Sequence, residues 1–144
     1  MLLTSNFPFN ETVDAMLGKC TSLRCLILAG MEHWKCLPDQ IQHLTSLEEL
    51  DLRDFGIEAL PEWFGNLESV NELRLSDCKK LRHLPSKQAM QSLSKLTYLY
   101  ICRCPLLIKE KRSNSNNNDD EVQQIVDSEW AKISHIPTVS AFEL

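Results

Sequence analysis

Long apolar runs are missing from this sequence. No stretch approaches the ~18 consecutive apolar residues that a membrane-spanning helix requires, so we expect no membrane span. The opening residues, MLLTSNFPFNE, contain no basic region and only a short apolar run, which is not typical of a secretory signal. Basic residues are also in deficit, because 15 Lys and Arg stand against 20 Asp and Glu, for a net charge of −5. We therefore expect neither nucleic acid nor an anionic membrane as the main partner.

The sequence also lacks the residue patterns that are typical of enzymes. No G-x-x-x-x-G-K-[S/T] phosphate loop is present, since Gly18-Lys19 is followed by Cys20 and no glycine stands five positions before Gly18. The histidines are scattered, and none has a nucleophile at a spacing that predicts catalysis; they are His33, His43, His83 and His135. We expect a protein that is not an enzyme, with no cofactor, no metal and no small-molecule substrate.

One phrase, L-x-x-L-x-L, recurs through the middle of the chain. Its first positions lie 24, 23 and 26 residues apart, a period within the range of leucine-rich repeats. The alternating part predicts a short strand with its leucines on one face, and stacked coils bury one another's leucines. The four copies are Leu23-x-x-Leu26-x-Leu28, Leu47-x-x-Leu50-x-Leu52, Val70-x-x-Leu73-x-Leu75 and Leu96-x-x-Leu99-x-Ile101.

A return arm follows each of the first three copies. It contains Leu-Pro at Leu37-Pro38, Leu60-Pro61 and Leu84-Pro85, and proline prevents the strand from continuing. The residues after each proline are long enough for a turn or two of helix or 3₁₀ helix. The fold that we predict is an α/β solenoid of the leucine-rich-repeat kind, with a short parallel concave sheet, an irregular or helical convex side, about four repeats and a C-terminal cap.

The chain divides into four parts on this interpretation. Residues 1–22 are interpreted as a truncated N-terminal repeat or helix, which suggests that more protein once lay upstream. Residues 23–108 form the leucine-rich repeats. Residues 109–120 are a charged, Asn-rich segment that we expect to be flexible. Residues 121–144 are a capping segment, in which Trp130, Ile133, Ile136 and Val139 are well placed to cover the open end of the last coil.

The six cysteines are not spaced as a disulfide framework or a metal site would be. Cys78 and Cys104 share one repeat position, where a short side chain hydrogen-bonds the backbone of the neighbouring coil. Cys25 and Cys102 fall on outward positions of the strands, and Cys102-x-Cys104 has too short a spacing for zinc. We expect free thiols in a reducing compartment, the cytoplasm, with the nucleus as a second location.

The outward positions of the strands predict a protein-binding surface on the concave face. Tyr and Arg side chains are typical interface anchors, and acidic side chains would orient a partner that carries a basic patch. The alternative is that Glu49–Arg74 and Asp51–Arg74 are merely cross-strand surface pairs. Trp34 and Phe64 fit core positions, whereas Trp63 is a weak second-site candidate. The predicted binding residues are Glu49, Asp51, Arg53, Glu72, Arg74, Tyr98 and Tyr100.

Three stretches carry a resemblance to a known family: Leu44–Leu50 (LTSLEEL), Leu75–Pro85 (LSDCKKLRHLP) and Ser128–Pro137 (SEWAKISHIP). They resemble the C-terminal leucine-rich repeats of plant intracellular nucleotide-binding (NLR) disease-resistance receptors, particularly the coiled-coil class. The resemblance implies binding of a pathogen effector or host protein, or docking on the receptor's own nucleotide-binding domain. Because the phosphate loop is absent, we expect a fragment or truncated relative. The alternative is a free-standing cytosolic scaffold or decoy.

Overall fold

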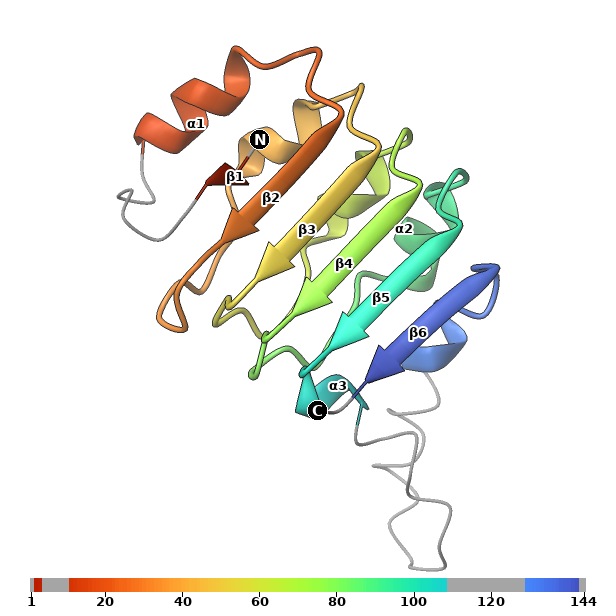
Figure 1. Cartoon of the computed structure of the whole chain (residues 1–144). Coiled ribbons are helices and arrows are strands. Elements are labelled where there is room, and N and C mark those ends of the chain that lie inside the picture. The colour runs from red at the N-terminus through yellow and green to blue at the C-terminus, as the bar shows by residue number, and fades with distance from the viewer. Residues whose placement is uncertain (1, 4–10, 109–128, 143–144) are drawn as a thin grey trace, which may run out of the picture.

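The structure, a computed structural model, describes residues 2–3, 11–108 and 129–142. Its centre is one parallel sheet whose strand order follows the chain, with helical segments behind it (Figure 1). The leucine-rich-repeat solenoid predicted from the sequence is therefore confirmed. The strands are β1 Leu2–Leu3, β2 Cys25–Ala29, β3 Glu49–Arg53, β4 Glu72–Ser76, β5 Tyr98–Cys102 and β6 Thr138–Phe142.

The register of the sheet aligns the repeat leucines across neighbouring coils. Leu50 of β3 lies beside Leu26 of β2 and Leu73 of β4. The inward side chains of β2 to β5 are at most 1% exposed. Burying a leucine stabilises a fold by about 1.5–3 kcal/mol, and here that gain depends on the coil on either side. The inward residues are Leu26, Leu28, Leu50, Leu52, Leu73, Leu75, Leu99 and Ile101.

The return arms form short helical segments, as predicted. Pro38 and Pro61 are in extended conformation and immediately precede the first two segments, where a missing N–H costs nothing. The third begins after Ser86, whose hydroxyl accepts a 3.2 Å hydrogen bond from the Ala89 N–H. Each segment buries one large apolar side chain into the core. The segments are η1 Asp39–His43, η2 Glu62–Asn66 and α2 Lys87–Ser92, and α3 Pro105–Ile108 follows β5.

A repeated turn ends the strands. Asp54, Asp77 and Arg103 directly follow β3, β4 and β5, and all three have positive φ angles of 51–58°. The N–H of each donates to the last carbonyl of the next strand, as from Asp54 to Ser76 at 2.9 Å. Aspartate tolerates this conformation better than arginine does. The Arg103 guanidinium is paired with the Asp77 carboxylate of the preceding coil at 2.7 Å.

The predicted thiol positions form a buried ladder. The Cys104 Sγ lies 3.7 Å from the Leu75 carbonyl of the preceding coil, and the Cys78 Sγ lies 3.5 Å from the Ser76 carbonyl. The hydrogen bond to Cys78, followed by burial, raises the pKa of the Cys104 thiol, which keeps it protonated. All six cysteines are free. Cys102 lies at an outward position of β5, as predicted, but it is only 7% exposed.

The two ends of the solenoid are closed by different devices. At the N-terminal end, β1 pairs with β2, and α1 (Glu11–Gly18) buries Leu17 completely. At the C-terminal end, Ile133 and Ile136 are buried while Trp130 and Val139 are half-buried against the core. The capping segment also adds β6 as a full parallel strand, which was not predicted from the sequence. The segment 109–120 and the start of the capping segment lie outside the described residues.

A buried carboxylate attaches the cap to the third coil. In the second coil, the Leu60 N–H donates to the His83 carbonyl of the next coil at 2.9 Å. At the equivalent Leu84, the N–H donates instead to Glu129 Oε2 at 2.7 Å. Lys132 Nζ donates to Glu129 Oε1 at 2.8 Å and to the Leu84 carbonyl at 3.3 Å. The cap therefore replaces the backbone partner that a further return arm supplies elsewhere.

We predict that Glu129→Ala lowers the free energy of unfolding by about 3 kcal/mol, because it leaves the Leu84 N–H and the Lys132 ammonium without their buried partner. Glu129→Gln keeps an oxygen that can accept from Leu84, and its loss should be smaller. Urea unfolding followed by circular dichroism measures both. Glu58→Ala, at an exposed glutamate, is the control and should change little. Equal stability of Glu129→Ala and the wild type would contradict this role.

Candidate functional site

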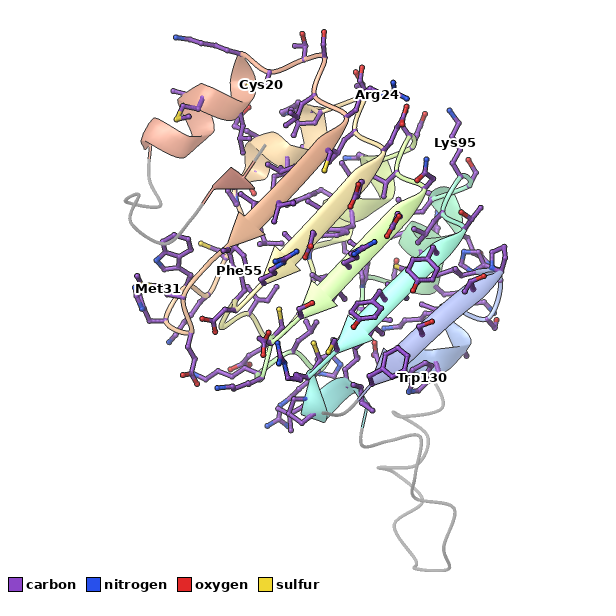
Figure 2. All side chains as sticks on the ribbon, viewed as in Figure 1. Cys20, Arg24, Met31, Phe55, Lys95 and Trp130 are labelled. Atoms are coloured by element: carbon purple, nitrogen blue, oxygen red, sulfur yellow. The ribbon has the colours of Figure 1, made fainter. Side chains whose placement is uncertain are left out.

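The outward side chains of the sheet gather on one face, opposite the helical return arms (Figure 2). We call this surface the sheet face. The strand register aligns its side chains in three columns, and the members from β2 to β5 follow the repeat spacing of the sequence. The columns run Cys25–Glu49–Glu72–Tyr98–Thr138, then Ile27–Asp51–Arg74–Tyr100–Ser140, then Ala29–Arg53–Ser76–Cys102–Phe142.

The charges of the sheet face are paired along the strands. Arg53 donates from Nε to both oxygens of Asp51, at 3.0 and 3.1 Å, and both residues belong to β3. Arg74 donates to Glu72 on β4 at 2.5 Å. The cross-strand pairing of Arg74 with Glu49 or Asp51 that we considered is therefore not the observed hydrogen bonding. Residues two apart on a strand share one face, so a long arginine side chain can fold back onto its own strand.

Electrostatics keep both guanidiniums charged. The hydrogen bond to Asp51, together with its charge, raises the pKa of Arg53. The hydrogen bond to Glu72 raises the pKa of Arg74, and the charges of Glu49 and Asp51 add to that effect across the strands. Burial, followed by a hydrogen bond to Glu49, raises the pKa of the Cys25 thiol. The middle of the sheet face thus carries three carboxylates and two guanidiniums, and each guanidinium is paired with a carboxylate of its own strand.

Accessibility separates the predicted binding residues into two groups. Asp51 is only 2% exposed, so it holds Arg53 in place and offers no surface to a partner. The Arg53 side chain is 49% exposed and the Arg74 side chain 42%. Glu49 and Glu72 are partly exposed. A partner lying on this face would therefore meet guanidinium planes held in place by carboxylates.

The C-terminal end of the sheet face is aromatic. Tyr98 and Tyr100 are partly exposed, and the ring of Tyr100 lies 5.8 Å from that of Phe142 at an angle of 41°. Phe142 is 48% exposed. Phe142 was not among the predicted binding residues, because β6 was not predicted from the sequence. The signal was the alternation in Thr138–Phe142 after Pro137, which places 138, 140 and 142 on one face.

The remaining aromatic candidates lie on the return side. Phe64 is 1% exposed, which confirms its core position, and Trp34 packs against the core 5.9 Å from Phe55. Trp63, the weak second-site candidate, stacks on Phe64 with ring centres 4.9 Å apart and is itself partly buried. That packing gives Trp63 a role in the core, away from the sheet face.

A metal site and a membrane-spanning helix are both absent from the described part of the chain. Within residues 2–3, 11–108 and 129–142, no three His, Cys, Asp or Glu side chains gather so that they could hold a metal ion. Over the same residues, the helices are too short and too polar to cross a bilayer.

Comparison with known proteins agrees with this architecture. The leucine-rich repeat region family matches residues 10–114, and the chain belongs to that family. The chain is 44% identical over 66 residues to the probable disease resistance protein At4g27220 of Arabidopsis thaliana. This match covers 45% of this chain and 7% of the relative. Disease resistance protein RPP4 and disease resistance-like protein DSC1, also from Arabidopsis thaliana, are 39% identical over 71 residues and 41% over 66.

These relatives are much longer than this chain. The match covers 49% of this chain and 6% of RPP4, and 46% of this chain and 5% of DSC1. The predicted resemblance to the leucine-rich repeats of plant disease-resistance proteins is confirmed by these matches. The activities of the full-length relatives are a separate question.

A double-mutant cycle tests the ion pair between Asp51 and Arg53 on the sheet face. We predict that Asp51→Asn and Arg53→Gln couple by about 1 kcal/mol in urea unfolding, because Asp51 is almost fully buried while half of Arg53 remains in water. The control cycle is Arg24 with Glu48, an ion pair of two exposed side chains at 2.7 Å. That control pair should couple more weakly. A weaker coupling for Asp51 with Arg53 than for the control pair would show that the buried carboxylate does not strengthen this ion pair.

Proposed function

We propose that this chain is a protein-binding leucine-rich-repeat module that acts in plant defence and takes its partner on the sheet face. The observation that carries the proposal is the register of β2 to β5, which aligns outward side chains in columns on the side of the sheet opposite the described return-arm helices (Figure 1). Kinship with disease resistance proteins supports the defence role. The binding residues that we propose are Glu49, Arg53, Glu72, Arg74, Tyr98 and Tyr100, with Asp51 positioning Arg53.

The chemistry of the sheet face divides the work of binding. Tyr98 and Tyr100 supply large, rigid rings at a low entropic cost, the property that makes tyrosine common at energetic centres of interfaces. Arg53 and Arg74 are held by carboxylates before a partner arrives, so fewer side-chain rotamers must be fixed on binding. The acidic residues nearer β2 would orient a partner that carries a basic patch.

We infer that the function is recognition and not catalysis. The described histidines are spread over different return arms and the cap, and both arginines of the sheet face are engaged in ion pairs. The partner that we propose is a pathogen effector or a host protein that such an effector modifies. The location that we propose is the cytoplasm, with the nucleus as a second compartment.

Two other functions fit the same surface. In the receptors that the sequence resembles, a repeat domain can dock on its own nucleotide-binding domain and hold it inactive. A free-standing repeat protein would act as a scaffold or decoy instead. Adding a purified nucleotide-binding domain in trans separates these ideas, because only the first predicts binding to that domain on the sheet face.

The decisive experiment is quantitative capture of partners from pathogen-challenged leaf extract on the immobilised chain. We predict that the double variant Tyr98→Ala, Tyr100→Ala loses roughly 30-fold in recovery of the specific partner, the effect of removing about 2 kcal/mol of interface contact.

The matched control is His43→Ala, Gln91→Ala, which removes two exposed side chains from return-side helices η1 and α2. This control variant should recover the partner as well as the wild type does. Circular dichroism checks that both variants fold. Unchanged recovery by the folded tyrosine variant would rule out the sheet face as the binding surface.

A further inference from the structure

The sheet ends on an uncharged strand. Among the described residues, β6 has one neighbouring strand, β5, and it is the outermost strand at the C-terminal end (Figure 1). Thr138–Phe142 contains no Lys, Arg, Asp, Glu or Pro. Edge strands usually carry such residues because exposed N–H and C=O groups can pair with another chain. The absence of these protective residues makes β6 a candidate pairing surface.

The register with β5 defines which backbone groups of β6 face outward. The Thr138 N–H donates to the Thr97 carbonyl, and the Phe142 carbonyl accepts from the Arg103 N–H. Because successive residues of a strand direct their N–H and C=O to opposite sides, Thr138, Ser140 and Phe142 bond toward β5. Val139 and Ala141 therefore direct theirs away from the sheet.

The side chains of β6 leave apolar surface incompletely covered. The inward residues Val139 and Ala141 are only partly buried, although the corresponding leucines of β2 to β4 are at most 1% exposed. On the sheet face, Phe142 is 48% exposed. A further layer over this end would bury both sets of side chains, which is the main source of stability in stacked repeats.

We propose that β6 is a self-association edge, and that its occupant is β6 of a second copy of this chain in antiparallel orientation. With the two-fold axis at Ser140, Val139 pairs with Ala141 of the second copy and Ala141 with its Val139. Each pair exchanges two backbone hydrogen bonds, so the outward groups of both strands are satisfied together. No charge opposes a like charge within the paired strands.

This geometry gives the dimer a continuous sheet face. Ser140 meets its own counterpart across the axis, and Phe142 lies opposite Thr138 of the second copy. The interface is isologous and closes after two copies. Two aromatic clusters, each with Tyr100 and Phe142, are then brought close to the axis.

The experiment is a sedimentation-velocity concentration series on the chain and its Ser140 variants. At high concentration, the sedimentation of the wild type should correspond to a particle of twice the 16.6 kDa mass of one chain. Ser140→Lys alone and Ser140→Glu alone should raise the dissociation constant by more than about 10-fold, because each places like charges across the axis. An equimolar mixture of the two variants should restore a one-to-one dimer.

The matched control is Ser76→Lys, the same substitution on the sheet face within the interior strand β4, which should leave the dimer unchanged. Thermal melting confirms that each variant folds. A monomeric wild type, open-ended assemblies, or a mixture of Ser140 variants that stays monomeric would each overturn the proposal.

Discussion

The structure depends on one constraint: no coil of this chain can bury its own leucines. A strand such as Glu72–Ser76 presents only two inward side chains, Leu73 and Leu75, and both are covered mainly by the coils on either side. The parallel ladder and the leucine stack therefore form together. The same ladder fixes the register of the outward residues, so the proposed binding surface is a consequence of how the core is built.

Where the repeat pattern ends, residues outside the repeats supply the hydrogen bonds and the strand that a further repeat would supply. The Leu84 N–H has no backbone partner of the kind that Leu60 finds, and the Glu129 carboxylate accepts its hydrogen bond instead. The strand that follows β5 comes from a segment more than thirty positions later in the chain. The Glu129 carboxylate and β6 thus supply hydrogen-bond partners to buried polar groups at the end of the array.

Much of the fold could be predicted from the sequence, because the repeat determines where the strands lie and how they pair. The spacing of Leu50 and Leu73 predicted the strands, their parallel order and the columns of outward residues. The same logic predicted the positions of Cys78 and Cys104. Periodicity carries this information because each coil must match its neighbour, and the match is confirmed in the register of the sheet.

The rest could not be predicted, since it depends on features that do not repeat. Arg74 reaches back to Glu72 on its own strand, a choice of side-chain rotamer that spacing does not specify. Asp51 is only 2% exposed although it lies at an outward position, and its carboxylate accepts hydrogen bonds from Arg53. β6 and Phe142 were not predicted, because one alternating stretch of five residues without the L-x-x-L-x-L phrase is a weak signal for a strand.

Native-state hydrogen exchange, followed residue by residue, tests the central claim most directly. The account predicts the slowest exchange for every amide of β4, since both alternating sets of N–H groups donate to the strands on its two sides, with protection falling toward both ends of the array. The amides of η1 and η2 should exchange faster. Fast exchange in β4 together with strong protection of the return-arm helices would contradict it.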